Sequence, residues 1–343
     1  MTTREPKGLE GGPEASGTTQ PIPHWPGGLV SVGDHKVYVR SVPESSTENG
    51  PVSDGREPAL CVHGLEGSSR NWTDLMELLR PRLACDALDL PGFGDSPPRP
   101  DGRYSIAALA QTVAALITAR NRVPGRGGPV HLIANSLGGA VAVKLAATRP
   151  ELIKTLTLIS PALPDSRPRL DLVRFPLLST PLGGRLLRRY QALPPANRVA
   201  DVITNCYCDP SLFPQSRFAA EVTELARRDT LDHATAALVG SIRTLTAEFL
   251  RMGRYTAWRD AARVTAPSLV IYGANDRLVD PRMAGRAAHA FADARIVVLP
   301  RTGHVAHMEH PGQVAAEIGV LLQSAPSGKG GDAAREFPLA PAG

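Results

Sequence analysis

The stretch Leu132–Ala140, with the sequence LIANSLGGA, restricts the folds that this chain can adopt more than any other part of the sequence. The apolar run at residues 130–134 is typical of a buried strand, and the Ala-rich run after it is typical of a helix. A serine at such a strand-to-helix turn, with small residues two positions away on each side, is held with its hydroxyl exposed above the sheet. Ser136 is therefore a candidate nucleophile, although Ala134 replaces the glycine that usually stands first. The alternative is a glycine-rich turn whose serine only caps the helix.

The rest of the chain alternates short apolar runs with helical patterns, which predicts an α/β fold. Runs with the length and composition of buried strands occur at residues 59–62, 84–88, 130–134, 155–159, 268–272 and 295–299. Helices are expected at residues 72–79, 105–117, 282–292 and 313–322, and residues 28–32 and 36–42 have the alternation of an N-terminal hairpin. Such alternation builds a doubly wound, mostly parallel sheet, with functional groups at the carboxyl ends of the strands.

The alternation is interrupted once, and the interruption defines the domain boundaries. The expected parts are a disordered tail (1–26), the first part of the core (27–162), a helical lid inserted late in the sheet (163–260), the second part of the core (261–323) and a second disordered tail (324–343). The lid begins with many prolines and continues with helical patterns at residues 216–226 and 234–253. The polar residues 44–57 are expected to form a surface loop.

Composition limits the class of protein. Apolar residues make up 42% of the chain and charged residues 21%, so a buried core is possible and global disorder is excluded. The formal net charge is +5 without a basic run interleaved with aromatic residues, so nucleic acid is not an expected partner. Neither a signal peptide nor a membrane-spanning run is recognisable, so we expect a cytoplasmic protein without stable membrane insertion. The four cysteines follow no redox or zinc spacing.

Asp276 and His304 each lie just past the end of a predicted strand, and so are expected at the same edge of the sheet as Ser136. A serine hydroxyl is a poor nucleophile at neutral pH and needs a neutral imidazole to take its proton. A carboxylate in turn fixes the tautomer of the imidazole. The chain order Ser136, Asp276, His304 predicts such a catalytic triad. Asp280 and Asp165 remain alternative acids.

Five motifs occur in order along residues 28–322: His63-Gly64, Asp89-x-x-Gly92-x-Gly94-x-Ser96, Ser136-x-Gly138-Gly139, Gly273-x-x-Asp276 and Gly303-His304-x-x-His307-x-Glu309-x-Pro311. Together they resemble the α/β-hydrolase superfamily, in its lid-bearing branch of small bacterial hydrolases and monoacylglycerol-lipase-like enzymes. The resemblance implies the α/β-hydrolase fold, the Ser136–His304–Asp276 triad and no cofactor. It also implies that the backbone N–H groups of Leu65 and Leu137 bind the oxyanion.

Several residues near these motifs have two interpretations. His63 is expected to brace the oxyanion loop rather than to act in catalysis. Trp72 either lines an acyl pocket or packs in the core, and Asn135 is a further candidate for the pocket wall. His310 and the two histidines of the last motif lack the spacing of a zinc site, and no carboxylate completes one, so no metal is expected.

The residue types at the candidate site favour acyl chemistry. Superfamily members that open epoxides or remove halide use aspartate at the position of Ser136, so those activities are not expected. The predicted function is a serine esterase with an apolar, small-molecule acyl substrate, and the oligomeric state is left open. One alternative is a carbon–carbon bond hydrolase of aromatic degradation, disfavoured by Val305 where those enzymes place tryptophan. The others are a haloperoxidase-like perhydrolase and a non-catalytic ligand-binding protein of the same fold.

Overall fold

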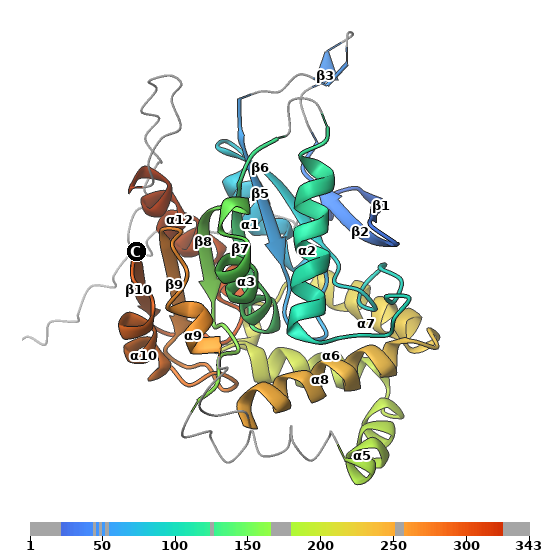
Figure 1. Ribbon diagram of the computed structural model, residues 1–343. Helices are drawn as coiled ribbons and strands as arrows, with labels where there is room; N and C mark the ends of the chain where they lie inside the picture. Colours follow the sequence, from blue (N-terminus) through green and yellow to red (C-terminus); the bar gives the residue numbers. More distant parts are fainter. Residues whose placement is uncertain are drawn as a thin grey trace, which may run out of the picture.

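The computed structural model describes residues 22–43, 46–47, 50–51, 55–123, 127–165, 180–250 and 257–324. Their centre is an eight-stranded sheet with the order β1-β2-β6-β5-β7-β8-β9-β10 (Figure 1). Its strands are β1 (Gly27–Val32), β2 (His35–Ser41), β5 (Glu57–Val62), β6 (Leu83–Leu88), β7 (Val130–Asn135), β8 (Ile153–Ile159), β9 (Ser268–Gly273) and β10 (Ala294–Leu299). Strand β2 is antiparallel to β1 and β6, and the other neighbours are parallel. The predicted doubly wound, mostly parallel sheet is confirmed.

Helices cover both faces of this sheet. The helical elements among the described residues, on these faces and elsewhere, are η1 (Ser69–Trp72), α1 (Thr73–Leu79), α2 (Ile106–Arg120), α3 (Leu137–Thr148), η2 (Pro150–Leu152), α5 (Pro181–Gln191), α6 (Pro195–Cys206), η4 (Pro210–Leu212), α7 (Gln215–Asp229), α8 (Ala234–Leu250), α9 (Ala257–Ala261), α10 (Met283–Ala290), α11 (Ala306–Glu309) and α12 (Pro311–Ser324). No helix among the described residues is long and apolar enough to cross a membrane.

Side chains of the central strands alternate between two apolar layers. In β5, Leu60 and Val62 belong to the layer that includes α2 and α3, whereas Ala59 and Cys61 belong to the layer that includes α1 and α12. Successive residues of a strand point to opposite faces, so a strand covered on both sides must be apolar throughout. This two-sided burial explains the uninterrupted apolar runs of the sequence.

Between β8 and β9 the described elements are all helices, and we call α5–α8 the helical insertion. Figure 1 shows α6, α7 and α8 below the sheet, with α5 at the periphery, and α6 packs against α7. Helices α7 and α8 correspond to the two predicted ones. Helix α6 was not predicted, because its starting proline, Pro195, suggested a break, although proline suits the first helical position. Helix α9 packs with α3 in the main core through Trp258, so the expected lid boundary at residue 260 lies too late.

Two expectations for loops and tails need correction. Residues 44–57 contain a small antiparallel ribbon, β3 (Ser46–Thr47) with β4 (Gly50–Pro51), as well as the start of β5. Residues 22–26 of the expected tail are held on the core: the His24 ring bonds to Thr73 Oγ1 at 2.7 Å, and Trp25 Nε1 donates to Thr73 O at 3.1 Å. Residues 1–21 and 325–343 lie outside the described residues.

Candidate active site

Ser136 stands at the turn between β7 and α3 with a backbone conformation that non-glycine residues rarely adopt. Its φ is 51° and its ψ −116°, and such strain costs about 1–3 kcal/mol. The turn is fixed by β8 and the residues after it: the Ser136 N–H donates to Ile159 O at 3.1 Å, and Ala162 N–H donates to Ser136 O at 2.9 Å. Ser136 keeps part of its surface exposed at the carboxyl end of β7.

Small residues around Ser136 let α3 approach the sheet closely. A Cβ atom on Gly138 would lie 2.4 Å from Val62 O and 2.5 Å from His63 O. A side chain at position 138 would therefore push the start of α3 away from the sheet. Ala134, which replaces the usual first glycine, is a fully buried strand residue of β7. A strand conformation needs no positive φ, so the alanine is accommodated.

Asp276 and His304 are brought together from the ends of β9 and β10. Asp276 is 1% exposed, and its Oδ2 lies 2.9 Å from His304 Nδ1. Its Oδ1 accepts the backbone N–H groups of Leu278 and Val279 at 2.8 and 2.9 Å. Burial alone would raise the pKa of Asp276, but His304 and the two N–H groups outweigh it and hold that pKa below its usual value. Asp280, the alternative acid, instead binds the Arg282 guanidinium at 2.6 Å.

The lowered pKa of Asp276 predicts a contribution to stability that depends on pH. A carboxyl group with a depressed pKa stabilises the folded state above its unfolded pKa of about 3.9, and this stabilisation is lost as the pH falls through the folded-state pKa. The loss of unfolding free energy in Asp276→Asn should therefore be larger at about pH 6 than at about pH 3. Urea unfolding at both pH values measures it. An equal loss at both would contradict the assignment of the charge to Asp276.

The backbone of His304 is held on two sides. Its N–H donates to Cys206 O at the end of α6, at 2.7 Å, and its C=O accepts Asn135 Nδ2 at 3.2 Å. Asn135 Nδ2 also donates to Ile159 O at 3.0 Å, and the residue is 4% exposed. Asn135 thus ties the serine turn to the histidine loop, a position that differs from the expected pocket wall.

The loop after β5 lies directly against the serine turn. A Cβ on Gly64 would lie 2.9 Å from Asn135 Oδ1 and 3.0 Å from Ser136 Cβ, so any other residue would push these two side chains aside. The buried ring of His63 uses both nitrogens: Nε2 accepts Leu90 N–H at 2.9 Å, and Nδ1 donates to Gly64 O at 2.7 Å. Burial lowers the pKa of His63, which keeps the ring neutral for this bracing contact. The next turn has a left-handed residue, Glu66, with φ 57°.

The side chains of Trp72, His307 and His310 are each engaged in a contact with another part of the protein. Trp72 is 0% exposed and stacks on His307 with ring centroids 4.2 Å apart, so it is a core residue and the pocket interpretation is wrong. Burial, with a smaller effect of His304, lowers the pKa of His307 to about 3. His310 Nε2 is directed to Arg301 O at 3.1 Å.

Apolar side chains of the helical insertion reach both loops that flank Ser136. Leu65 packs against a cluster formed by Leu187 of α5 with Leu238 and Ile242 of α8. Val305, next to His304, packs against a second cluster, formed by Val199, Ile203, Tyr207 and Leu225. The space near the candidate site is therefore bordered by apolar surface on two sides.

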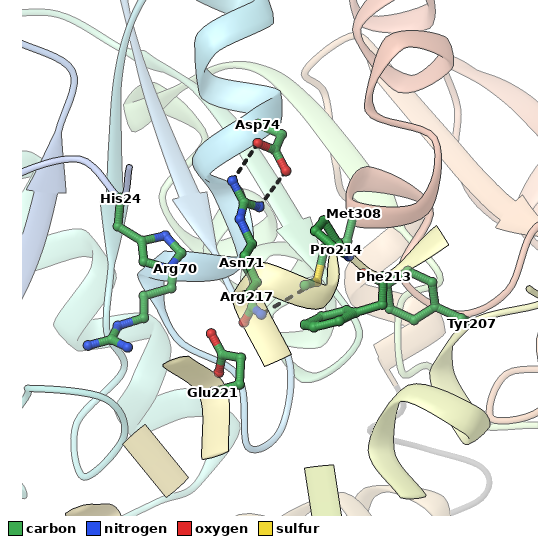
Figure 2. Close-up of a pocket in the computed structure, with 10 residues that line it drawn as sticks. All are labelled: His24, Arg70, Asn71, Asp74, Tyr207, Phe213, Pro214, Arg217, Glu221 and Met308. Carbon is green, nitrogen blue, oxygen red and sulfur yellow. Dashed lines mark hydrogen bonds and ion pairs between the residues drawn. The ribbon is translucent and has the colours of Figure 1, made fainter. Parts of the chain in front are cut away.

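A small cavity lies where the insertion meets η1 and α1 (Figure 2). Arg217 of α7 makes a two-pronged ion pair with Asp74 of α1 there, at 2.5 and 2.7 Å. Asn71 Nδ2 contacts Met308 Sδ at 3.4 Å in the same wall. The cavity volume of about 20 Å³ holds no more than a water molecule. The cavity is a seam between the insertion and the core rather than a substrate site.

One buried carboxylate beside the candidate site was not singled out from the sequence. Glu309 appeared only as one residue of the last motif, but it is 6% exposed, and its carboxylate accepts backbone N–H groups of both the histidine loop and the insertion. Only its spacing from His304 was visible in the sequence, since its partners at residues 208 and 209 are about a hundred positions away.

Eight mostly parallel strands, a helical layer on each face and a serine turn between a central strand and its helix define the α/β-hydrolase fold. The sequence matches the alpha/beta hydrolase family over residues 59–317, and the chain belongs to that family. Among solved structures, a candidate lipase from Acinetobacter baumannii AYE shares the fold with a TM-score of 0.70 and 20% identity, over 88% of this chain and 91% of that one.

Three relatives indicate the range of activities near this chain. It is 25% identical over 270 residues to the dihydrolipoyllysine-residue acetyltransferase component of the acetoin cleaving system of Pseudomonas putida, covering 79% of this chain and 64% of that longer protein. It is 25% identical over 281 residues to the pimeloyl-acyl-carrier-protein methyl ester esterase of Neisseria meningitidis serogroup B, covering 78% and 94%. It is 24% identical over 264 residues to a 2-hydroxy-6-oxononadienedioate/2-hydroxy-6-oxononatrienedioate hydrolase of Cupriavidus pinatubonensis, covering 75% and 83%. The family and the last two relatives support a hydrolase activity without fixing a substrate.

Proposed function

We propose that this chain is a serine hydrolase that cleaves carboxylic esters through an acyl-Ser136 intermediate. The observation that carries the proposal is the 2.9 Å contact between His304 Nδ1 and Asp276 Oδ2, beside the strained turn that holds Ser136. With Nδ1 committed to Asp276, His304 Nε2 is the nitrogen left to receive the Ser136 proton. The pair supplies an oriented base, and the turn supplies an exposed nucleophile.

The proposed reaction proceeds in two balanced halves. Ser136 Oγ attacks the carbonyl carbon of the ester while its proton passes to His304 Nε2, and Asp276 stabilises the imidazolium. The tetrahedral intermediate collapses by breaking the bond to the alcohol oxygen, which takes the proton from His304. Water then attacks the acyl-enzyme by the same route, releasing the carboxylic acid and restoring the Ser136 hydroxyl.

Backbone N–H groups of Leu137 and Leu65 are the proposed oxyanion donors. Leu137 is the first residue of α3, where N–H groups have no acceptor within the helix. Leu65 follows Gly64, which lies against Ser136. Leu137 follows the proposed nucleophile in the chain and Leu65 follows Gly64, and one such donor is expected to contribute about 3–4 kcal/mol to stabilising the transition state.

An apolar acyl group suits the surroundings of this site. The clusters around Leu65 and Val305 border it with aliphatic side chains from the helical insertion, which we propose acts as a lid over the carboxyl edge of the sheet. The similarity to a methyl ester esterase agrees with a carboxylic ester as the substrate. Burial of each additional methylene should increase kcat/KM by up to about fourfold, until the acyl chain outgrows the pocket.

A series of p-nitrophenyl esters from acetate to long acyl chains tests the proposal, together with labelling by a fluorophosphonate. We expect turnover throughout, a maximum at a medium or long chain, and one label per chain. An absence of both turnover and labelling would contradict the ester hydrolase and favour a non-catalytic role.

A carbon–carbon bond hydrolase is the second candidate, favoured by the similarity to the 2-hydroxy-6-oxononadienedioate hydrolase. The same serine turn and histidine serve both reactions, but Val305 occupies the position after His304. Comparing kcat/KM for a ring-cleavage product with that for the best ester separates the two candidates. A higher value for the ring-cleavage product would replace the esterase proposal.

A further inference from the structure

The carboxylate of Glu309 joins two segments that are distant in the sequence. Its Oε1 accepts the backbone N–H groups of Cys208 and Asp209 at 2.9 and 3.0 Å, and its Oε2 accepts the N–H of Gly303 at 2.6 Å. Cys208 and Asp209 follow α6 of the helical insertion, whereas Gly303 immediately precedes His304. One nearly buried carboxylate therefore satisfies three backbone donors.

The backbones of these two segments also touch directly. His304 N–H donates to Cys206 O at 2.7 Å. A Cβ atom on Gly303 would lie 2.3 Å from Cys206 O and 2.6 Å from Cys208 N, so the segments approach as closely as only glycine permits. Glu309 lies at the edge of this contact and accepts hydrogen bonds from backbone N–H groups on both sides of it.

We infer that Glu309 is a positioning residue, which fixes His304 by fastening the turn after α6 to the loop that carries the histidine. The inference rests on the proposed function, in which His304 Nε2 must lie within reach of Ser136 Oγ. Because the bonds hold backbone atoms, they set the direction in which the imidazole leaves the main chain. The turn 206–209 is then part of the frame of the active site, and it stays in place when substrate enters.

Two substitutions in the full-length chain test this role. Glu309→Gln keeps the volume but presents an NH₂ group to one of the two segments, and Glu309→Asp keeps the charge but is one methylene too short to span them. Glu317→Gln is the matched control, because Glu317 of α12 pairs with Arg295 of β10 at 2.7 Å. The readings are kcat and KM for p-nitrophenyl acetate, the rate and end point of fluorophosphonate labelling, and hydrogen exchange in residues 203–212 and 300–309.

For both Glu309 variants we expect kcat and the labelling rate to fall by about 10- to 100-fold, the effect of a displaced catalytic group. KM should change little, the labelling end point should remain one per chain, and exchange should accelerate in both segments together. Glu317→Gln should leave all these readings at the wild-type level. If Glu309→Gln does not fold, the same readings on Glu309→Asp decide.

Two outcomes would overturn the inference, and they differ in what else they refute. Variants with the wild-type kcat and labelling rate, even with a lowered melting temperature, would show that the carboxylate supports the fold alone. A wild-type chain that is neither labelled nor active would refute the proposed function together with this inference.

Discussion

Replacing Ser136 with alanine is expected to lower kcat for p-nitrophenyl acetate by about a millionfold and to abolish fluorophosphonate labelling. The variant would keep the proposed base and oxyanion donors but would have no oxygen with which to form the proposed acyl intermediate. Alanine keeps the Cβ atom and so the same backbone strain, and the unfolding free energy should change by no more than about 0.5 kcal/mol. Stopped-flow or end-point hydrolysis, mass spectrometry of the label and urea unfolding measure the three effects.

Ser160 offers a matched control for this substitution. It stands at the end of the neighbouring strand β8 with a similar left-handed backbone, φ 44°. Its hydroxyl is fully buried and has no hydrogen-bond partner among the described residues. Ser160→Ala should therefore keep both turnover and labelling. Stoichiometric labelling of Ser136→Ala would exclude Ser136 as the nucleophile.

Asp276→Asn should lower kcat by about ten-thousandfold, with a much smaller change in KM. The amide can still accept the N–H groups of Leu278 and Val279, so the side chain keeps its place. It cannot stabilise the imidazolium, and its NH₂ group would hold His304 in the wrong tautomer. Steady-state kinetics on the purified variant, normalised to the folded fraction, measure the loss.

Asp280→Asn is the control for the acid, because Asp280 binds the backbone and the guanidinium of Arg282. Its kcat should remain near the wild-type value. A loss of activity in Asp280→Asn, combined with an active Asp276→Asn, would transfer the role of the acid to Asp280.

The parts of the fold that depend on local sequence were predictable. Buried parallel strands are apolar on both faces, so β5 and β7 stand out as uninterrupted runs. Ser105 was recognisable as the residue that caps α2, and its side chain accepts the Ala108 N–H at 3.2 Å. The positions of Ser136, Asp276 and His304 followed from the same rule, since each comes just after a strand.

The parts that depend on tertiary contacts were not predictable. Asn135 follows the predicted strand at residues 130–134, which made it a candidate for the pocket wall. In the structure its amide donates to the backbone oxygens of Ile159 and His304, which only the sheet order brings within reach. Trp72 has the same sequence context whether it faces a pocket or the core, and stacking on His307 decides between them. The start of α6 was missed because a proline such as Pro195 can stand either after the end of a helix or at its first position, and the sequence alone does not tell the two apart.

The backbone contact between the turn 206–209 and Gly303 limits how chimeras of this protein can be made. Side chains of α5 and α8 that face Leu65 can be exchanged for those of a relative without touching that contact. Transplanting α6 and its turn would instead place the main chain of another protein against Gly303, where no space is left for a different backbone path. Such a graft is expected to need the donor's own residues 303–309 as well, so the proposed lid and the loop that carries His304 would have to be exchanged together.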